Sequence, residues 1–340
     1  MVSGCDCMSV TVVVGGQYGD EGKGKIISYL ALHDKPDVIA RGGGGPNAGH
    51  SVEHGSKKYS IRLVPSGFVN QQSKLAIGAG VLVDAGVFLR EVETFGLGSR
   101  CIIDRRATLI TQEMKDADAA SETAKKIGTT KTGMGPAQAA RASRTAPTVE
   151  SEPRLKKYLG DVPALVNSAK NVLVEGSQGF MLSNLYGTYP FVTSKDVSAS
   201  TICAEVGLGP RSVKDVIMVI KAYTTRVGSG PMPGELSVAD AEKRGMQEYG
   251  TVTGRPRRTN PDLIWDELRF SAQVNSASFI ALTKLDVKFP ACAKKKEYDE
   301  LPLEAKNFVK QIENEVGVKV GLIGTGPDAD DIIDRREQDE

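Results

Sequence analysis

A glycine-rich stretch near the N-terminus carries the residues best suited to chemistry. Residues 15–25 read Gly-Gly-Gln-Tyr-Gly-Asp-Glu-Gly-Lys-Gly-Lys. They follow the β-branched run 10–14 and precede the apolar run 26–32, so we expect a strand, a turn and a helix in that order. In this arrangement, the backbone N–H groups at the helix N-terminus can bind phosphate. The stretch therefore predicts a phosphate loop, with a plain glycine-rich turn as the alternative.

The predicted loop departs from the usual nucleotide-binding motif at one position. Residues 19–25 fit G-x-x-x-x-G-K, but Ile26 stands where that motif has the Ser or Thr that binds Mg²⁺. The loop instead contains a carboxylate, Asp20. This carboxylate could bind the metal or act as a base, so we expect phosphate binding combined with further chemistry.

A second motif, Thr-Lys-Leu-Asp at 283–286, follows the apolar run 279–283. A carboxylate at a strand end can accept hydrogen bonds from both N1–H and the 2-amino group of guanine. Adenine presents neither donor, so such a site selects GTP over ATP. The last expected strand leads into Gly-Thr-Gly-Pro-Asp at 324–328, whose backbone could close over the base. A surface turn is the alternative for the tetrapeptide.

The elements that must position these motifs alternate between strands and helices. Expected strands are 10–14, 37–41, 59–64, 74–77, 171–174, 216–223, 279–283 and 318–323, and expected helices are 26–32, 84–94, 113–126, 262–274 and 304–315. This order predicts an α/β fold with a mostly parallel central sheet flanked by helices and a P-loop-like GTP-binding architecture. We expect one large domain over 10–340 with inserted loops and helices, a disordered tail over 1–9, and a flexible insertion over 147–161. Ligands should lie at the carboxyl ends of the strands.

Composition excludes several classes of function. The chain has 43 Lys and Arg against 42 Asp and Glu, so bulk charge gives no reason to expect nucleic acid or an anionic membrane as a partner. No apolar run approaches the roughly 20 residues that span a bilayer. The five scattered cysteines are typical of a reducing compartment, and we expect a cytoplasmic protein. Cys5 and Cys7 are a weak metal signal and are assigned to the tail. Of the three histidines, His33 is expected at a helix end and His54 in a solvated loop.

Taken together, the motifs resemble the adenylosuccinate synthetase family, the GTP-dependent ligases that join IMP to aspartate. The resemblance is carried by the motifs at 19–25, 47–50, 128–136, 175–179, 187–194, 221–231, 253–258, 283–286 and 324–328, in the family's order. It implies two steps: phosphoryl transfer from GTP to O6 of IMP, then displacement by the aspartate amino group. It also implies one Mg²⁺ per subunit and GTP as a co-substrate, in AMP synthesis.

The resemblance implies a role for each of the following residues. Catalysis falls to Asp20, His50 and Gln178, and the metal ligands would be Asp20 and the Gly49 carbonyl. GTP binding would use Gly19, Glu21, Gly22, Lys23, Gly24, Lys25, Gly49, His50, Ser51, Arg257, Lys284, Asp286, Gly324 and Gly326. IMP binding would use Asp20, Asn47, Thr129, Thr130, Arg144, Gln178 and Thr193, and aspartate binding would use Thr251, Val252, Thr253 and Arg255. Arg144 would reach the neighbouring subunit's site, so a homodimer is implied.

The chain also departs from many members of the family. It is a short form, and material is missing between 104 and 128, between 144 and 173, and between 287 and 304. Because the motifs are retained, we expect trimmed surface elements. A GTPase-like switch is the second hypothesis, opposed by Ile26 and by the additional anion-binding loops. A related ligase with another acceptor nucleotide or amino acid is the third.

Overall fold

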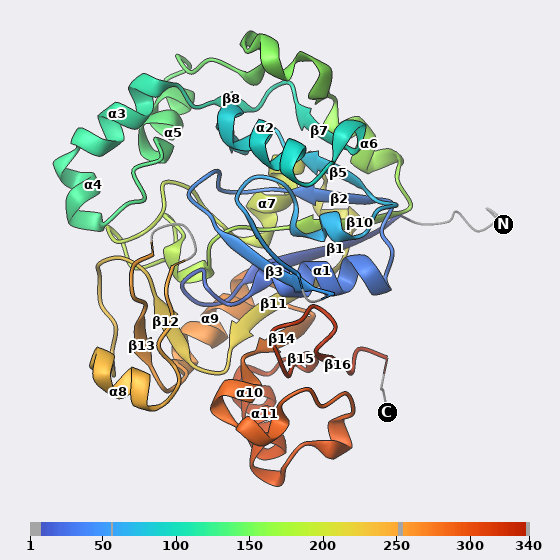
Figure 1. Ribbon diagram of the computed structural model, residues 1–340, viewed down its shortest axis with the longest axis vertical. Coiled ribbons are helices and arrows are strands. Elements are labelled where there is room, and N and C mark those ends of the chain that lie inside the picture. Colours follow the sequence, from blue (N-terminus) through green and yellow to red (C-terminus); the bar gives the residue numbers. More distant parts are fainter. Residues whose placement is uncertain (1–7, 56, 251–253, 338–340) are drawn as a thin grey trace.

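The computed structural model describes residues 8–55, 57–250 and 254–337. Its centre is a ten-stranded sheet with the spatial order β16-β15-β14-β11-β1-β10-β2-β5-β7-β9 (Figure 1). Every neighbouring pair is parallel except β15 and β16, which are antiparallel. The predicted α/β fold with a mostly parallel sheet is therefore confirmed.

The bounds of the elements are as follows. The large sheet contains β1 (Ser9–Gly15), β2 (Val38–Arg41), β5 (Lys74–Ile77), β7 (Cys101–Asp104), β9 (Leu159–Gly160), β10 (Asn171–Glu175), β11 (Val213–Lys221), β14 (Phe279–Thr283), β15 (Val320–Gly324) and β16 (Ile332–Asp334). Three small sheets pair β3 (His50–His54) with β4 (Lys57–Ile61), β6 (Leu82–Val83) with β8 (Thr108–Leu109), and β12 (Thr224–Arg226) with β13 (Arg258–Asn260). The helices are α1 (Lys23–His33), α2 (Ala85–Thr94), α3 (Gln112–Ala120), α4 (Glu122–Ile127), α5 (Met134–Ala142), α6 (Val162–Ser168), α7 (Ala199–Val206), α8 (Val238–Lys243), α9 (Trp265–Asn275), α10 (Leu285–Lys288) and α11 (Leu303–Val316).

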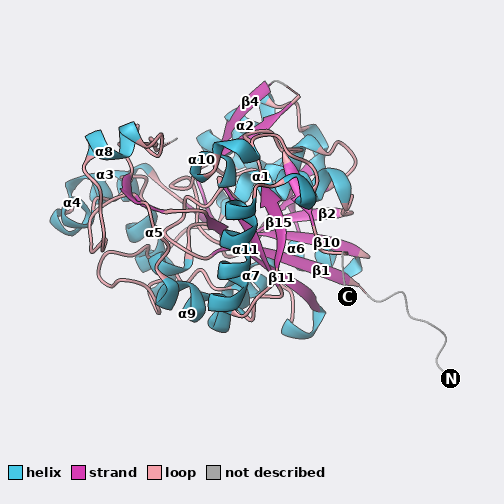
Figure 2. Ribbon diagram, turned by 90° about the horizontal axis from the view of Figure 1, so that it is seen from below, coloured by secondary structure: helices cyan, strands magenta, loops and turns pink. Residues whose placement is uncertain are grey.

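The sheet is buried on both faces because its strands are apolar at successive positions. In β1, Val13 packs on the face covered by α1 and α2, whereas Val12 and Val14 pack on the face covered by α6 and α7. The side-chain alternation of a strand sends these residues to opposite faces. Beyond β11, helices α9 and α11 cover the second face. Figure 2 shows helices on both sides of the strands.

Several local predictions are wrong. The tail expected to be disordered over 1–9 includes Ser9, which begins β1, while 1–7 lie outside the described residues. The expected helix 113–126 is two helices, because Ser121 takes an extended conformation and its hydroxyl caps α4 by accepting from the Ala124 N–H at 3.2 Å. The expected strand 59–64 is shifted, since β4 ends at Ile61, which faces His50 in the β3–β4 register. His54, expected in a loop, is the last residue of β3. His33 does end α1 as predicted.

The segment 147–161, expected to be a flexible insertion, is packed against the core. It forms two 3₁₀ turns, Val149–Ser151 and Pro153–Tyr158, followed by β9. Leu155 is fully buried, and the ring of Tyr158 meets Phe88 of α2 edge to face, with centroids 5.1 Å apart. The sequence 147–161 shows no helical period of apolar residues because a 3₁₀ turn repeats every three residues rather than every 3.6.

The fold brings the predicted loops to one edge of the sheet. Since β1, β2, β10, β11, β14 and β15 are mutually parallel, their carboxyl ends lie at the same edge. At this edge Figure 1 shows α3, α4 and α5 on one side and β12 and β13 on the other. Among the described residues, no helix is both long and apolar enough to cross a bilayer.

Candidate active site

The stretch between β1 and α1 has the geometry of a phosphate loop. Gly22 precedes the first residue of α1 with φ of 87°, a left-handed conformation that favours glycine. Glu21 braces the loop from inside, because its carboxylate accepts from the Gln17 N–H at 3.0 Å and from the Gly19 N–H at 2.8 Å. Its other oxygen pairs with the buried Lys23 ammonium at 2.7 Å. In this state Glu21 therefore stabilises the loop, and its carboxylate compensates the charge of Lys23.

The unusual Ile26 has a packing explanation. Its side chain is fully buried in the core between α1 and the sheet. A Ser or Thr hydroxyl directed toward a metal at this position would sacrifice that burial. The position thus contributes to the core, and Asp20 is the loop carboxylate that does not hold the loop itself, unlike Glu21.

Asp20 is held between two cations. One of its oxygens lies 2.9 Å from the Arg257 guanidinium and the other 3.1 Å from the Lys221 ammonium. Lys221 is 2% exposed and also contacts Glu248 at 2.9 Å. Burial opposes the lysine charge, but Asp20 and Glu248 hold the pKa of Lys221 above its ordinary value. Arg257, which belongs to the loop before β13, is the more exposed of the two cations.

His50 sits in a second buried network. Its Nδ1 lies 2.9 Å from the Glu175 carboxylate, and its Nε2 lies 3.0 Å from the Arg41 guanidinium. Arginine can only donate, so Nε2 accepts and the imidazole proton is on Nδ1. Burial and the positive charge of Arg41 lower the pKa of His50 to about 4. His50 is therefore neutral in this state.

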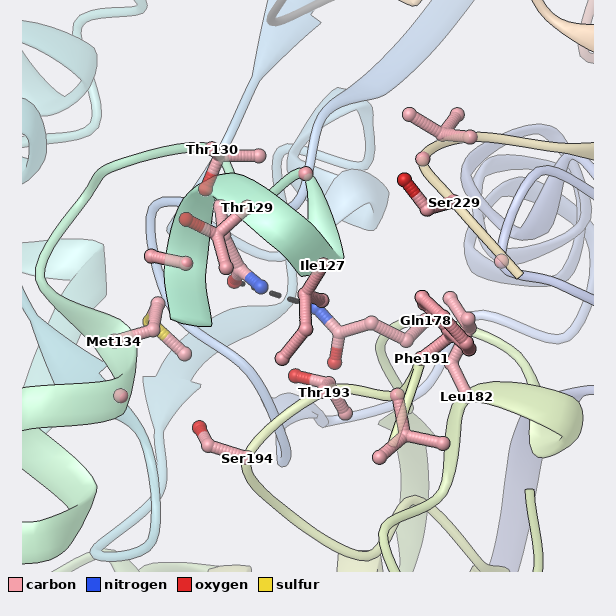
Figure 3. A pocket seen from close by; sticks show the side chains of 18 of the residues that line it. Ile127, Thr129, Thr130, Met134, Gln178, Leu182, Phe191, Thr193, Ser194 and Ser229 are labelled. Atoms are coloured by element: carbon pink, nitrogen blue, oxygen red, sulfur yellow. Dashed lines mark hydrogen bonds between the residues drawn. The ribbon is translucent and has the colours of Figure 1, made fainter. Parts of the chain in front are cut away.

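A cavity of about 670 Å³ opens beside these groups. Its lining includes the predicted residues Gly19, Asn47, Gly49, His50, Thr129, Thr130, Gln178, Thr193 and Arg257. Figure 3 shows the Gln178 side chain extending into the cavity between Ile127 and Thr193. The side-chain NH₂ group of Gln178 donates to the Asn47 side chain at 3.3 Å. The side-chain oxygen of Gln178 is buried and has no hydrogen-bond partner among the described residues. The residues that line the cavity therefore include a buried acceptor that makes no hydrogen bond within the described structure.

The predicted base-binding motif, 283–286, begins at the last residue of β14 and contacts the phosphate loop. The Thr283 hydroxyl donates to the Glu21 carbonyl at 2.6 Å. One carboxylate oxygen of Asp286 is buried and accepts no hydrogen bond from any described residue. Lys25 reaches from α1 to donate to the Gly326 carbonyl at 2.5 Å, and burial lowers its pKa to about 8. The predicted guanine motif and the loop after β15 are thus neighbours.

Several predicted residues lie outside the cavity. Arg144 is exposed just beyond the end of α5. Arg255 is also exposed and donates to the Gly128 carbonyl at 3.3 Å. Thr251, Val252 and Thr253 lie outside the described residues. Ser51 is an exposed residue of β3, next to His50.

Sequence reasoning missed three charged groups that hold the site together. Arg41 pairs with Glu175 at 3.1 Å, and Lys221 pairs with Glu248 at 2.9 Å. Arg41 ends the otherwise apolar strand β2, and Lys221 ends β11 directly after the buried apolar run 216–220. A charge that ends a buried strand requires a partner, and this signal could have identified the two basic residues. Glu248 offered no comparable signal.

These features define a class of protein. A phosphate loop, a guanine-type motif and a separate cavity with paired acid and base groups meet at one sheet edge, as in a nucleotide-dependent enzyme that acts on a second substrate. The family model for adenylosuccinate synthetase matches residues 12–152 and 145–291. The chain belongs to the adenylosuccinate synthetase family, whose members are ligases that form a C–N bond between IMP and aspartate at the expense of GTP.

Known proteins resemble the chain over nearly its full length. An adenylosuccinate synthetase of Archaeoglobus fulgidus is 51% identical, and the match covers 97% of this chain and 99% of that protein. The protein of Pyrococcus horikoshii is 49% identical, with 97% and 99% covered. The solved adenylosuccinate synthetase of Plasmodium falciparum has a TM-score of 0.89 and 28% identity, with 96% and 99% covered. The first two relatives therefore share the short length of the chain.

Proposed function

We propose that the ligation proceeds through 6-phosphoryl-IMP and that Asp20 removes the N1 proton of IMP. The supporting observation is the position of Asp20 in the phosphate loop, one residue from the cavity-lining Gly19 and paired with the cavity-lining Arg257. A base at this point can act on a nucleotide in the cavity while the loop holds the phosphates of GTP. Lys221 holds the carboxylate in position, and geometry is the first requirement of a base.

His50 is the proposed group that stabilises charge on the transferring phosphoryl group or on O6. Donation from Nε2 requires a proton there, but Nε2 now accepts from Arg41. His50 must therefore exchange Arg41 for the substrate and take up a second proton from solvent, on Nε2, when the site fills. Glu175, fixed by the Ser66 hydroxyl at 2.7 Å, remains as the acceptor for Nδ1–H.

The residues present fit a Mg²⁺ ion. Asp20 and the carbonyl of Gly49 are oxygen donors, which Mg²⁺ prefers. In this structure the Asp20 carboxylate already contacts two positive charges, those of Lys221 and Arg257. We propose these two residues as the protein ligands, one ion per subunit. When bound, the ion would neutralise charge on the phosphates.

The proposed substrate contacts are those that the family motifs imply. For IMP we propose the cavity residues Asn47, Thr129, Thr130, Gln178 and Thr193. For GTP we propose Gly19, Glu21, Gly22, Lys23, Gly24, Lys25, Gly49, His50, Ser51, Arg257, Lys284, Asp286, Gly324 and Gly326. For aspartate we propose Arg255 with Thr251, Val252 and Thr253. A cytoplasmic location is proposed as well, in keeping with the free thiols of Cys101, Cys203 and Cys292.

Isotope exchange tests the intermediate. GTP labelled with ¹⁸O in the β–γ bridge is incubated with Mg²⁺ and IMP but without aspartate. If phosphoryl transfer to IMP is reversible and precedes aspartate attack, the label scrambles to non-bridging positions of recovered GTP. Asp20→Asn should abolish scrambling. Absence of scrambling in the wild-type protein, together with full ligase activity, would favour a concerted reaction.

We also propose a homodimer in which Arg144 completes the neighbouring IMP site. Its exposure beyond α5, away from its own cavity, supports this arrangement. Arg144→Leu and Asp20→Asn should each be inactive alone. Mixed and re-equilibrated, they should recover about a quarter of the wild-type activity, because half of the dimers are mixed and each has one intact site. No recovery after verified subunit exchange would contradict the shared site.

A further inference from the structure

Two histidines and two aspartates from three chain segments meet outside the catalytic cavity. His33 ends α1, His54 ends β3, and Asp328 and Asp330 lie between β15 and β16. Ligand atoms of His54, Asp328 and Asp330 lie within 4.8 Å of one another. Nε2 of His33 lies 3.0 Å from the Asp330 carboxylate. We call these four residues the His–Asp cluster.

The described residues leave the charges and hydrogen bonds of the His–Asp cluster incompletely satisfied. Among the described residues, neither Asp328 nor Asp330 has a Lys or Arg partner for its carboxylate. The nearby Lys296 instead donates to the backbone carbonyl of Asp330 and contacts Asp331 at 3.3 Å. Nδ1 of His54 is buried without a hydrogen-bond partner in the described structure, 3.8 Å from Asp330. Two carboxylates without a Lys or Arg partner among the described residues therefore lie beside an imidazole nitrogen that makes no hydrogen bond.

We propose that the His–Asp cluster binds a divalent transition-metal ion of the Zn²⁺ type. Imidazole nitrogen with carboxylate oxygen is a donor set that suits Zn²⁺, whereas Mg²⁺ prefers oxygen alone. Zinc ligands lie about 2.0–2.2 Å from the metal, so the present side chains must close slightly around it. The 49% exposure of both His33 and Asp330 leaves them room to rotate.

The site would join three segments that also contribute to the proposed GTP site. Helix α1 begins at the phosphate loop, β3 begins at His50, and the β15–β16 connection contains Gly326. The Ala329 N–H already donates to the Glu53 carbonyl at 2.7 Å, which holds this connection against β3. A bound ion would reinforce that contact and raise stability by mass action. The metal site does not depend on the proposed catalytic roles.

The test uses the full chain without a polyhistidine tag, in a Cys5→Ser/Cys7→Ser background that removes the competing tail thiols. Equilibrium dialysis should find one Zn²⁺ per chain, and Zn²⁺ should raise the midpoint of thermal unfolding. Co²⁺ should bind without a thiolate charge-transfer band. His54→Gln and Asp330→Asn should each weaken Zn²⁺ binding at least tenfold, because each removes a ligand. The exposed Asp299→Asn serves as the matched control and should bind as before.

His50 is the only histidine outside the cluster, so imidazole ligation points directly to His33 and His54. Failure of the background protein to bind Zn²⁺ would overturn the proposal. So would unchanged affinity in both His54→Gln and Asp330→Asn. Thermal unfolding without metal should match across the variants, which excludes misfolding as the cause of lost binding.

Discussion

Replacing Asp286 with Asn tests the assignment of the nucleotide base. The carboxylate oxygen that is buried without a partner among the described residues is the proposed acceptor for guanine. In Asp286→Asn one oxygen becomes an NH₂ group that faces the 2-amino group of guanine. The variant therefore loses a charge-assisted hydrogen bond and places two donors against each other.

The magnitude follows from these two effects. A hydrogen bond to a charged group contributes about 1.5–3 kcal/mol, and an unpaired buried donor costs about 1–3 kcal/mol. A central total of about 4 kcal/mol corresponds to roughly a thousandfold weaker GTP binding at 1.4 kcal/mol per tenfold. Since the base is remote from the transferred phosphate, KM for GTP should rise while kcat at saturation changes little. Stability should be unchanged, because the oxygen accepts no hydrogen bond from the described protein.

Xanthosine triphosphate provides the matched probe. Xanthine has a carbonyl where guanine has its amino group, so the side-chain NH₂ group that the Asp286→Asn substitution introduces should donate to it. Steady-state assays with both nucleotides should show that Asp286→Asn prefers xanthosine triphosphate, whereas wild type and Asp299→Asn prefer GTP. A folded Asp286→Asn protein whose KM for GTP changes less than about fivefold, with no gain for xanthosine triphosphate, would refute the assignment.

Further predictions concern the two buried networks. Lys221→Met should lower the free energy of unfolding by about 3 kcal/mol, since it removes the buried cation that Asp20 and Glu248 share. Urea denaturation would measure this, and a smaller loss in Lys221→Met/Glu248→Gln than in Lys221→Met would confirm the cause. His50 has its pKa lowered from 6.5 to about 4, so the unfolded chain binds more protons between these values and stability falls as pH drops through that window. Between pH 7 and pH 5 the shifted pKa of His50 should lower the free energy of unfolding by roughly 2 kcal/mol. His50→Gln should remove this contribution from the pH dependence of urea unfolding. An identical pH slope in the variant would contradict the prediction.

Much of the fold was predictable because the relevant signals are local. The runs 10–14, 171–174 and 279–283 are apolar at successive positions, as strands buried on both faces must be. Their parallel pairing then forces the following loops to one edge. The phosphate loop and Asp286 were found because each directly follows such a strand.

The parts that could not be predicted depend on long-range contacts. Lys221 and Asp20 are 201 residues apart in sequence, and their ion pair appears only once β11 lies beside β1. The same holds for Arg41 with Glu175 and for the packing of Tyr158 on Phe88. The break at Ser121 was missed because a serine in a polar helical stretch can either cap or continue the helix.

The most direct test of the account is phosphate release from GTP with Mg²⁺, measured with IMP and L-aspartate present together, singly, or absent. The ligase should release phosphate steadily only when both are present, with one adenylosuccinate formed per phosphate. Sustained release that is independent of IMP and aspartate would contradict it and favour a GTPase-like switch. Turnover only with another nucleotide or amino acid would contradict the assigned acceptors.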